Sequence, residues 1–303
     1  MLRKCLFGLL FFIFFYNPSY SQITDKPIYE MERDAHLKFF DRLYSNYKSD
    51  ENLNVIYYKL NLAITNQPDF LNGEVTINAV SKVNNITSIF YDFSNNLTVD
   101  SVSYNNKLLS FNHSQNKIFI TFGNSFNLNQ LISVKIFYHG VPVPTGFGSF
   151  IFGSHNNNEP SIWTISEPYG SSDWFPCKNV PSDKADSSDV WLRCSDKLTA
   201  VSNGTLKEIQ NNGDGTMTYK WHSSYPIANY LISLAISNFA QYNFYFKYSL
   251  QDSMPVVNYI YPENLAGLIP QLNKTKLMLE LFSQKYGPFP FLNEKYGHAE
   301  IGR

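Results

Sequence analysis

Alternating apolar and polar positions dominate the chain from about residue 54 to 250 and predict a β-rich structure. Within 58–64 and again within 75–79, every second residue is apolar. This period of two is that of a strand with one buried face. We expect a turn at Asn72-Gly73, ahead of the second of these strands. Shorter runs predict further strands and a hairpin, at Ser88–Phe93, Leu97–Tyr104, Lys117–Phe122, Leu131–His139 and 205–221. Many short strands at this spacing favour an antiparallel sandwich or saddle of sheets.

Helical periodicity flanks this region on both sides. Apolar residues recur at helical spacing over 27–47 and predict a short helix there. After a buried-looking strand at Val256–Tyr261, Pro262-Glu263 opens a second helix that runs to about Tyr286. The second half of this helix is apolar nearly all round, so we expect it to need cover on more than one side. A strand predicted at 296–301 follows, and one helix with two strands does not complete a domain.

Residues 1–21 have the pattern of a secretory signal peptide. Arg3 and Lys4 precede an apolar run from Leu6 to Tyr16, and small residues precede a predicted cleavage after Ser21. The alternative is an uncleaved anchor, although this run is short for a bilayer and no other stretch approaches transmembrane length. We therefore expect a secreted, periplasmic or cell-surface protein with no membrane span once the signal is removed.

Composition narrows the possible functions. Hydrophobic residues make up 44% of the 303 and aromatic residues 17%, which excludes a disordered chain. Lys and Arg number 24 against 25 Asp and Glu, so there is no basic excess of the kind that nucleic-acid binding requires. Cys177 and Cys194 remain after signal removal, and the sequence leaves open whether they pair.

Familiar catalytic motifs are missing from the sequence. None of the six histidines lies in a His-Glu-x-x-His motif, and there is no Gly-x-Ser-x-Gly elbow or phosphate-binding glycine loop. We therefore predict neither a catalytic residue nor a metal ligand in this chain. The most distinctive stretch is a predicted loop over 164–177, in which Glu167 lies near aromatic residues and a Phe-Pro-Cys turn. Taken alone, such a glutamate is either solvated or functional.

Several spaced motifs resemble those of the aminopeptidase N family, which are zinc-dependent gluzincin metallopeptidases. The family's N-terminal β-saddle domain carries Glu/Gln-Ala-x-x-x-Arg-x-x-Phe-Pro-Cys-x-Asp-x-Pro-x-x-Lys-Ala. This chain has Glu167, Phe175-Pro176-Cys177, Pro181 and Lys184-Ala185 in matching register, with Ser172 and Asn179 where the family has Arg and Asp. Two later stretches also resemble family segments, namely Tyr225–Leu231 and Tyr286–Phe291.

The resemblance implies a fold and a domain organisation. We expect a mainly β, aminopeptidase N-like saddle of antiparallel sheets, preceded by a signal peptide and a short helix. It would be followed by the incomplete start of an α/β catalytic domain. The boundaries are then 1–21 for the signal peptide, 22–53 for the helical segment, 54–250 for the saddle and 251–303 for the incomplete domain.

The resemblance also implies a function. This chain would be the N-terminal portion of a secreted zinc aminopeptidase, ending before the zinc-binding motif and inactive alone. Zinc would belong to a full-length relative. Glu167 matches the position at which the family's saddle domain binds the free amino terminus of a peptide substrate. The alternative is a non-catalytic secreted β-sandwich that binds peptides or glycans. Residue preference, oligomeric state, surface attachment and the cause of the truncation are not predictable from the sequence.

Overall fold

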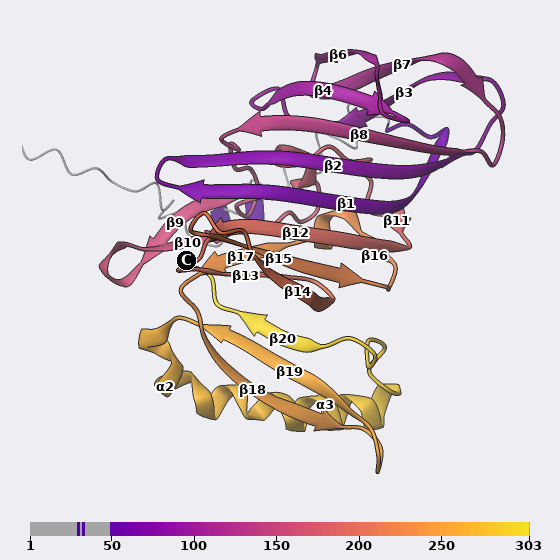
Figure 1. The fold of residues 1–303 in the computed structure, drawn as a ribbon. Coiled ribbons are helices and arrows are strands. Elements are labelled where there is room, and N and C mark those ends of the chain that lie inside the picture. Colours follow the sequence, from indigo (N-terminus) through magenta and orange to yellow (C-terminus); the bar gives the residue numbers. More distant parts are fainter. Residues whose placement is uncertain (1–28, 31, 34–48, 303) are drawn as a thin grey trace, which may run out of the picture.

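A computed structural model describes residues 29, 30, 32, 33 and 49–302 and consists mainly of strands (Figure 1). The predicted signal peptide and most of the predicted helix over 27–47 lie outside the described residues, although the four described there are helical. Within the described part of the chain, no helix is long and apolar enough to cross a membrane.

The largest element is a sheet of eight strands, in the order β14-β15-β12-β1-β2-β8-β4-β5. Its long central strands alternate buried and partly exposed side chains, with the period of two that the sequence predicted. All pairings are antiparallel except that of β1 with β12, which is parallel and joins segments more than a hundred residues apart. The bounds are β1 Leu53–Asn66, β2 Asp69–Ser81, β4 Thr98–Tyr104, β5 Lys107–Leu108, β8 Leu131–Gly140, β12 Ser187–Ser195, β14 Thr205–Asn211 and β15 Thr216–Ser223.

Smaller sheets pack against one face of the large sheet and enclose a common hydrophobic core. One has the order β3-β7-β6, another β13-β17-β10-β9, and a third pairs β11 with β16. Their bounds are β3 Ile86–Asp92, β6 Ser110–Ser114, β7 Lys117–Phe126, β9 Ile151–His155, β10 Glu159–Trp163, β11 Lys184–Ala185, β13 Thr199–Ser202, β16 Ile227–Ala228 and β17 Leu234–Ser237. Three short 3-10 turns lie at Asn156–Asn158, Ser171–Asp173 and Asn229–Leu231. The predicted architecture of antiparallel sheets is confirmed.

The turn predicted at Asn72-Gly73 is wrong. Both residues lie inside β2, and the chain instead reverses between Asn66 and Asp69. Gly73 is needed for a different reason, because a Cβ atom there would lie 2.2 Å from the ring of Tyr138. The glycine lets a large buried aromatic ring cross the strand.

A second, smaller layer follows the β-rich part (lower half of Figure 1). Strands β18 (Ala240–Lys247), β19 (Ser253–Ile260) and β20 (Tyr296–Ala299) form one sheet, in which β19 and β20 run parallel. Helices α2 (Pro262–Leu272) and α3 (Lys274–Tyr286) cover it. Phe246, Met254, Val256 and Leu279 form the buried centre of this layer, separate from the main core. The domain boundary at 250 stays a prediction, and the hairpin β18–β19 spans it.

The single helix predicted over 262–286 is divided in two. It breaks at Asn273, three residues after Pro270, which lies inside α2 and has no N–H to donate to the preceding turn. The predicted apolar surface of its second half is present on α3. Leu277, Leu281 and Phe282 are each at least half exposed.

Candidate substrate-anchoring site

Glu167 is an exposed side chain in a loop whose other residues are largely buried. The loop leaves β10 at Trp163, and within it Ser166 is 2% exposed and Trp174 and Phe175 are fully buried. The peptide bond between Glu167 and the following proline is cis. The predicted loop is present and Glu167 is exposed in it, while the role of Glu167 in binding stays a prediction.

Hydrogen bonds fix the backbone on both sides of Glu167. Before it, Ile165 donates from its backbone to Gly148, 3.0 Å away. After it, Gly170 donates to the Ser166 carbonyl at 2.8 Å, closing a tight turn around the glutamate. The buried indole of Trp174 donates to the Ser166 hydroxyl at 3.0 Å. The backbone that carries the carboxylate is therefore fixed by hydrogen bonds to buried groups. A side chain that binds a ligand needs such a rigid support.

A buried polar cluster lies beneath the same loop. The side-chain amide of Asn179 donates to the carbonyl of Tyr169 and to the hydroxyl of Ser172, each at 2.8 Å. Its oxygen accepts from the amide of Asn229, also at 2.8 Å, and its backbone N–H donates to Asp92 at 3.0 Å. Asn179 and Asn229 are fully buried. The cluster connects the loop to the end of β3 through Asp92 and to the 3-10 turn at Asn229–Leu231 through Asn229.

A buried ion pair holds the far end of the loop. Lys178 and Asp183 are 2.7 Å apart, with side chains only 9% and 10% exposed. The Lys178 ammonium also donates to the carbonyl of Leu53 at 2.6 Å, which ties the loop to the start of β1. The nearby carboxyl of Asp50 has its pKa raised by burial. Because removal of either partner would leave a buried charge, this pair fixes the loop's conformation.

A cavity of about 310 Å³ lies where β10 and its neighbours meet the second layer. Thr164, three residues before Glu167, lines it together with His298 and Ile301. Lys295 also lines the cavity, and burial lowers the pKa of its ammonium to about 8. Burial likewise lowers the pKa of His298, whose Nδ1 donates to Asn258 at 2.7 Å. Thr164, directly after β10, and His298, on β20, therefore line the same cavity.

Polar and aromatic contacts join the two layers beside this cavity. His155 lies 2.7 Å from the carboxylate of Glu263 at the start of α2, and its ring stacks on Tyr261 with centroids 3.7 Å apart. The hydrogen bond to His155 lowers the pKa of Glu263. The Tyr261 hydroxyl lies 2.5 Å from that of Ser161, and the Tyr261 N–H donates to Glu300 at 2.8 Å. Together these contacts fix the second layer against the edge of the β9–β10 sheet.

Cys177 and Cys194 are both buried thiols that are not joined in a disulfide. Burial raises the pKa of the Cys194 thiol to about 12, so that it is protonated at neutral pH. The Cys177 sulfur accepts a weak contact from the Asn229 amide at 3.7 Å. Both cysteines act as packing groups in this structure.

Comparison with known proteins matches most of the β-rich part to one family. Residues 54–231 match the Peptidase M1 N-terminal domain. The chain belongs to this family. It is 27% identical over 210 residues to Leucine aminopeptidase 2 of the yeast Vanderwaltozyma polyspora. That alignment covers 67% of this chain but only 31% of the relative.

Solved M1 zinc metallopeptidases share the fold. A mutant of the enzyme from Deinococcus radiodurans superposes with a TM-score of 0.67 at 20% identity, over 82% of this chain and 56% of that one. A two-domain M1 zinc metallopeptidase mutant bound to L-tryptophan gives a TM-score of 0.71 at 20% identity, over 83% and 57%. The chain therefore spans little more than half the length of these enzymes.

The residues that the structure describes do not fit a zinc ion. Among the described residues, no three His, Cys, Asp or Glu side chains are placed to hold a metal. The sequence itself has no His-Glu-x-x-His. The similar solved structures are M1 zinc metallopeptidases. The described residues of this chain offer no group that could hold the zinc ion of such enzymes.

The sequence missed two features of the site. One is the pairing of Ser172 with Asn179, which in the sequence were only separate departures from the family motif. The other is Lys295, whose Nζ donates to the Ser202 carbonyl at 3.0 Å and lies 4.9 Å from the centre of the Trp221 ring. A lysine between polar residues gives no local signal of burial, so only the fold could reveal it.

Proposed function

We propose that this chain is the N-terminal portion of an exported, zinc-dependent aminopeptidase. The family match supports a metallopeptidase origin. Aminopeptidase activity is suggested by the name of the yeast relative and by structures of M1 enzymes bound to amino acids or to the peptide Tyr-Ser-Ala. The zinc ligands would lie outside these 303 residues, and zinc would supply the activation of water for hydrolysis.

The contribution of this chain is to hold and orient the substrate's amino terminus through Glu167. The observation that carries this role is an exposed carboxylate on a backbone anchored on both sides. A carboxylate attracts a protonated α-amine and forms charge-assisted hydrogen bonds with it. An acetylated or internal amide has no positive charge to offer. The site would therefore select free N-termini.

Substitution of Glu167 tests the proposed role. The experiment uses the longer protein that also contains the zinc-binding part. Loss of one charge-assisted contact should lower kcat/KM for a free-amine peptide by roughly 10- to 100-fold in Glu167→Gln. The acetylated peptide, already a poor substrate, should change little. Glu159→Gln, an exposed glutamate on β10, is the matched control. Equal losses for free and acetylated peptides would show that Glu167 only shapes the loop.

Export rests on the pattern of residues 1–21 and has a separate test. The mature protein recovered outside the cytoplasm should begin at Gln22, as read by mass spectrometry of its N-terminal peptide. Recovery of a protein that still begins at Met1 would contradict cleavage.

A further inference from the structure

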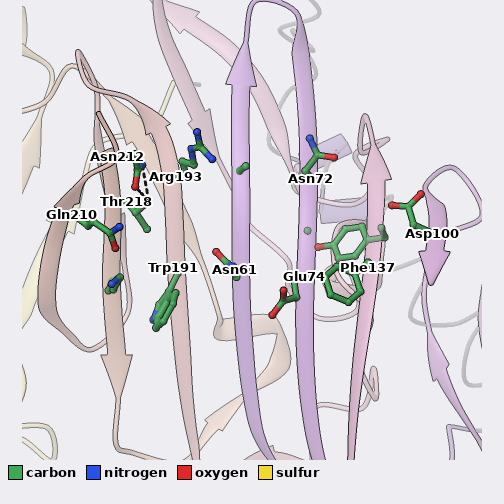
Figure 2. A pocket seen from close by; sticks show the side chains of 14 residues that line it. Asn61, Asn72, Glu74, Asp100, Phe137, Trp191, Arg193, Gln210, Asn212 and Thr218 are labelled. Atoms are coloured by element: carbon green, nitrogen blue, oxygen red, sulfur yellow. Dashed lines mark hydrogen bonds between the residues drawn. The ribbon is translucent and has the colours of Figure 1, made fainter. Parts of the chain in front are cut away.

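A groove of about 420 Å³ crosses the face of the eight-stranded sheet that points away from the core. Figure 2 shows Asn61 on β1 and Asn72 on β2 at its centre, with Trp191 and Arg193 on one side and Phe137 on the other. The floor is low because Ala63 lies on β1 between larger residues of the neighbouring strands. This volume lies within the range of about 300–1,000 Å³ that is typical of small-molecule sites.

Charged side chains in the groove are already paired. Glu74 lies 3.0 Å from Lys135, Asp100 lies 2.8 Å from His139, and Lys220 lies 2.9 Å from Glu208. Arg193 pairs with Asp214 and donates from Nε to the Thr216 hydroxyl at 2.9 Å. A charged ligand would have to displace one of these partners. The four charged side chains that line the groove are two acids and two bases, so their formal charges cancel.

Uncharged amides are the polar groups that the groove leaves available. Among the described residues, the side chains of Asn61, Asn72 and Gln210 make no hydrogen bond, although all three line the groove. Each primary amide offers a donor and an acceptor side by side. Such a pair matches two neighbouring hydroxyl groups, each of which both donates and accepts.

We propose that this groove binds a neutral oligosaccharide. The ligand's hydroxyls pair with the three amides, and its apolar C–H surface packs against the half-buried ring of Phe137. Trp191 forms one wall of the groove. Two ammonium groups hold its indole ring in place, with the Nζ of Lys59 3.5 Å and the Nζ of Lys220 4.8 Å from the ring centre.

A peptide fits this surface less well. Extended peptides bind sheets through the free main-chain groups of an edge strand. The centre of the groove lies over β12, β1 and β2, which are central strands with both edges already paired, and Gln210 adds a side chain from the edge strand β14. Only side chains are left to meet a ligand there, which favours a ligand that carries its hydrogen-bonding groups on its outer surface. This site is independent of the function proposed for Glu167.

Isothermal titration with defined hexasaccharides tests the proposal. Cellohexaose, laminarihexaose, mannohexaose and xylohexaose are the neutral probes, with a galacturonate hexamer and hexaglycine for comparison. At least one neutral probe should bind with a Kd on the order of 0.1–1 mM, because few contacts repay the loss of sugar hydration. Changing NaCl from about 50 to 500 mM should alter that Kd less than about two-fold, since no ion pair forms.

Variants place the binding in the groove. Asn61→Ala with Asn72→Ala should weaken binding by about 10- to 100-fold, at roughly 3- to 10-fold for each lost hydrogen bond. Asn54→Ala, an exposed asparagine on β1 outside the groove, should leave it unchanged. On titration, the side-chain amide NMR signals of Asn61, Asn72 and Gln210 should shift together.

Three results would overturn the proposal. They are the absence of saturable binding by all four neutral probes up to about 10 mM, tighter binding of the galacturonate hexamer or hexaglycine, and full binding by the double variant. The NMR shifts guard against a misfolded variant, because they are read on the unaltered protein.

Discussion

Asn179 donates a 2.8 Å hydrogen bond to Ser172, and these are two of the three positions at which this chain departs from the family's loop motif, the third being Pro168 in place of Ala. Where the aminopeptidase N motif has Arg and Asp, the chain has two uncharged residues that contact one another. Both are buried, at 9% exposed for Ser172 and 0% for Asn179. A neutral pair avoids the desolvation of two charges. The two departures are therefore one coupled change.

A double-mutant cycle measures this coupling. Asn179→Ala should lower the free energy of unfolding by about 2–4 kcal/mol, because the Tyr169 carbonyl and the Asn229 amide each lose a partner. Ser172→Ala should cost about 1 kcal/mol, and the double variant less than the sum by about 0.5–1.5 kcal/mol. Urea unfolding followed by circular dichroism provides the values. Strict additivity would show that the contact contributes no coupling.

Gly73→Ala should destabilise the large sheet. The new methyl group would meet the Tyr138 ring, whose nearest atoms lie 2.2–2.5 Å from the position of the added Cβ. Tyr138 is itself fixed by a 2.7 Å hydrogen bond to the Trp174 carbonyl, so the ring has little room to move. We expect a loss of about 2–3 kcal/mol in the free energy of unfolding.

Gly123→Ala is the matched control. It is also a strand glycine, in β7, and has no atom within 4 Å of the added Cβ. Its free energy of unfolding should stay within about 0.5 kcal/mol of the unaltered protein. Equal effects of the two substitutions would mean that Tyr138 does not require the glycine.

Lys295 should give the second layer a pH-dependent stability. Burial lowers its folded-state pKa from 10.5 to about 8, so between these values the unfolded chain binds more protons than the folded one. Stability must therefore rise with pH across about 8 to 10.5. Buried tyrosines such as Tyr259, with its pKa raised to about 12, act in the opposite direction above pH 10. For that reason the lysine is isolated by comparison with Lys295→Met.

The unaltered protein should gain stability relative to Lys295→Met by on the order of 1–3 kcal/mol between pH 7.5 and 10.5. Urea unfolding of both proteins at a series of pH values gives this difference. A difference that is flat with pH would show that Lys295 keeps an ordinary pKa, held by the Ser202 carbonyl and the Trp221 ring.

Much of the fold was predictable because period-two patterns report one-sided burial directly. The long strands β1, β2 and β8 of the large sheet follow that rule, and the hairpin predicted over 205–221 is present as β14–β15. The parallel pairing of β1 with β12 was not predictable, since nothing local in either strand specifies a partner so distant in sequence. Asn72-Gly73 misled because a glycine that admits an aromatic ring looks the same in sequence as a glycine in a turn.

The candidate site was predictable only in part. The loop motif indicated Glu167, and the structure leaves that side chain exposed. The polar cluster beneath the loop depends on Asn229, fifty residues away, so no spacing rule could have connected it to Asn179. The groove on the sheet was hidden for a similar reason, because its amides come from separate strands that only the fold brings together.

Zinc retention tests whether the 303 residues lack a metal site. The sequence has no His-Glu-x-x-His, so the purified chain should keep far less than one zinc per molecule after dialysis. It should also release no fluorophore from aminoacyl amides. Stoichiometric zinc measured by plasma mass spectrometry, together with chelator-sensitive turnover, would contradict this expectation.

The nucleotide sequence past codon 303 tests most directly whether this chain is the N-terminal portion of a zinc aminopeptidase. The alignment covers only 31% of the yeast relative, and we propose that the remaining part of such an enzyme is encoded downstream. We predict a Gly-rich Met-Glu segment and a His-Glu-x-x-His motif, in some reading frame, within about a hundred codons, a range taken from ordinary domain sizes. A downstream region that encodes neither in any frame would contradict the proposal.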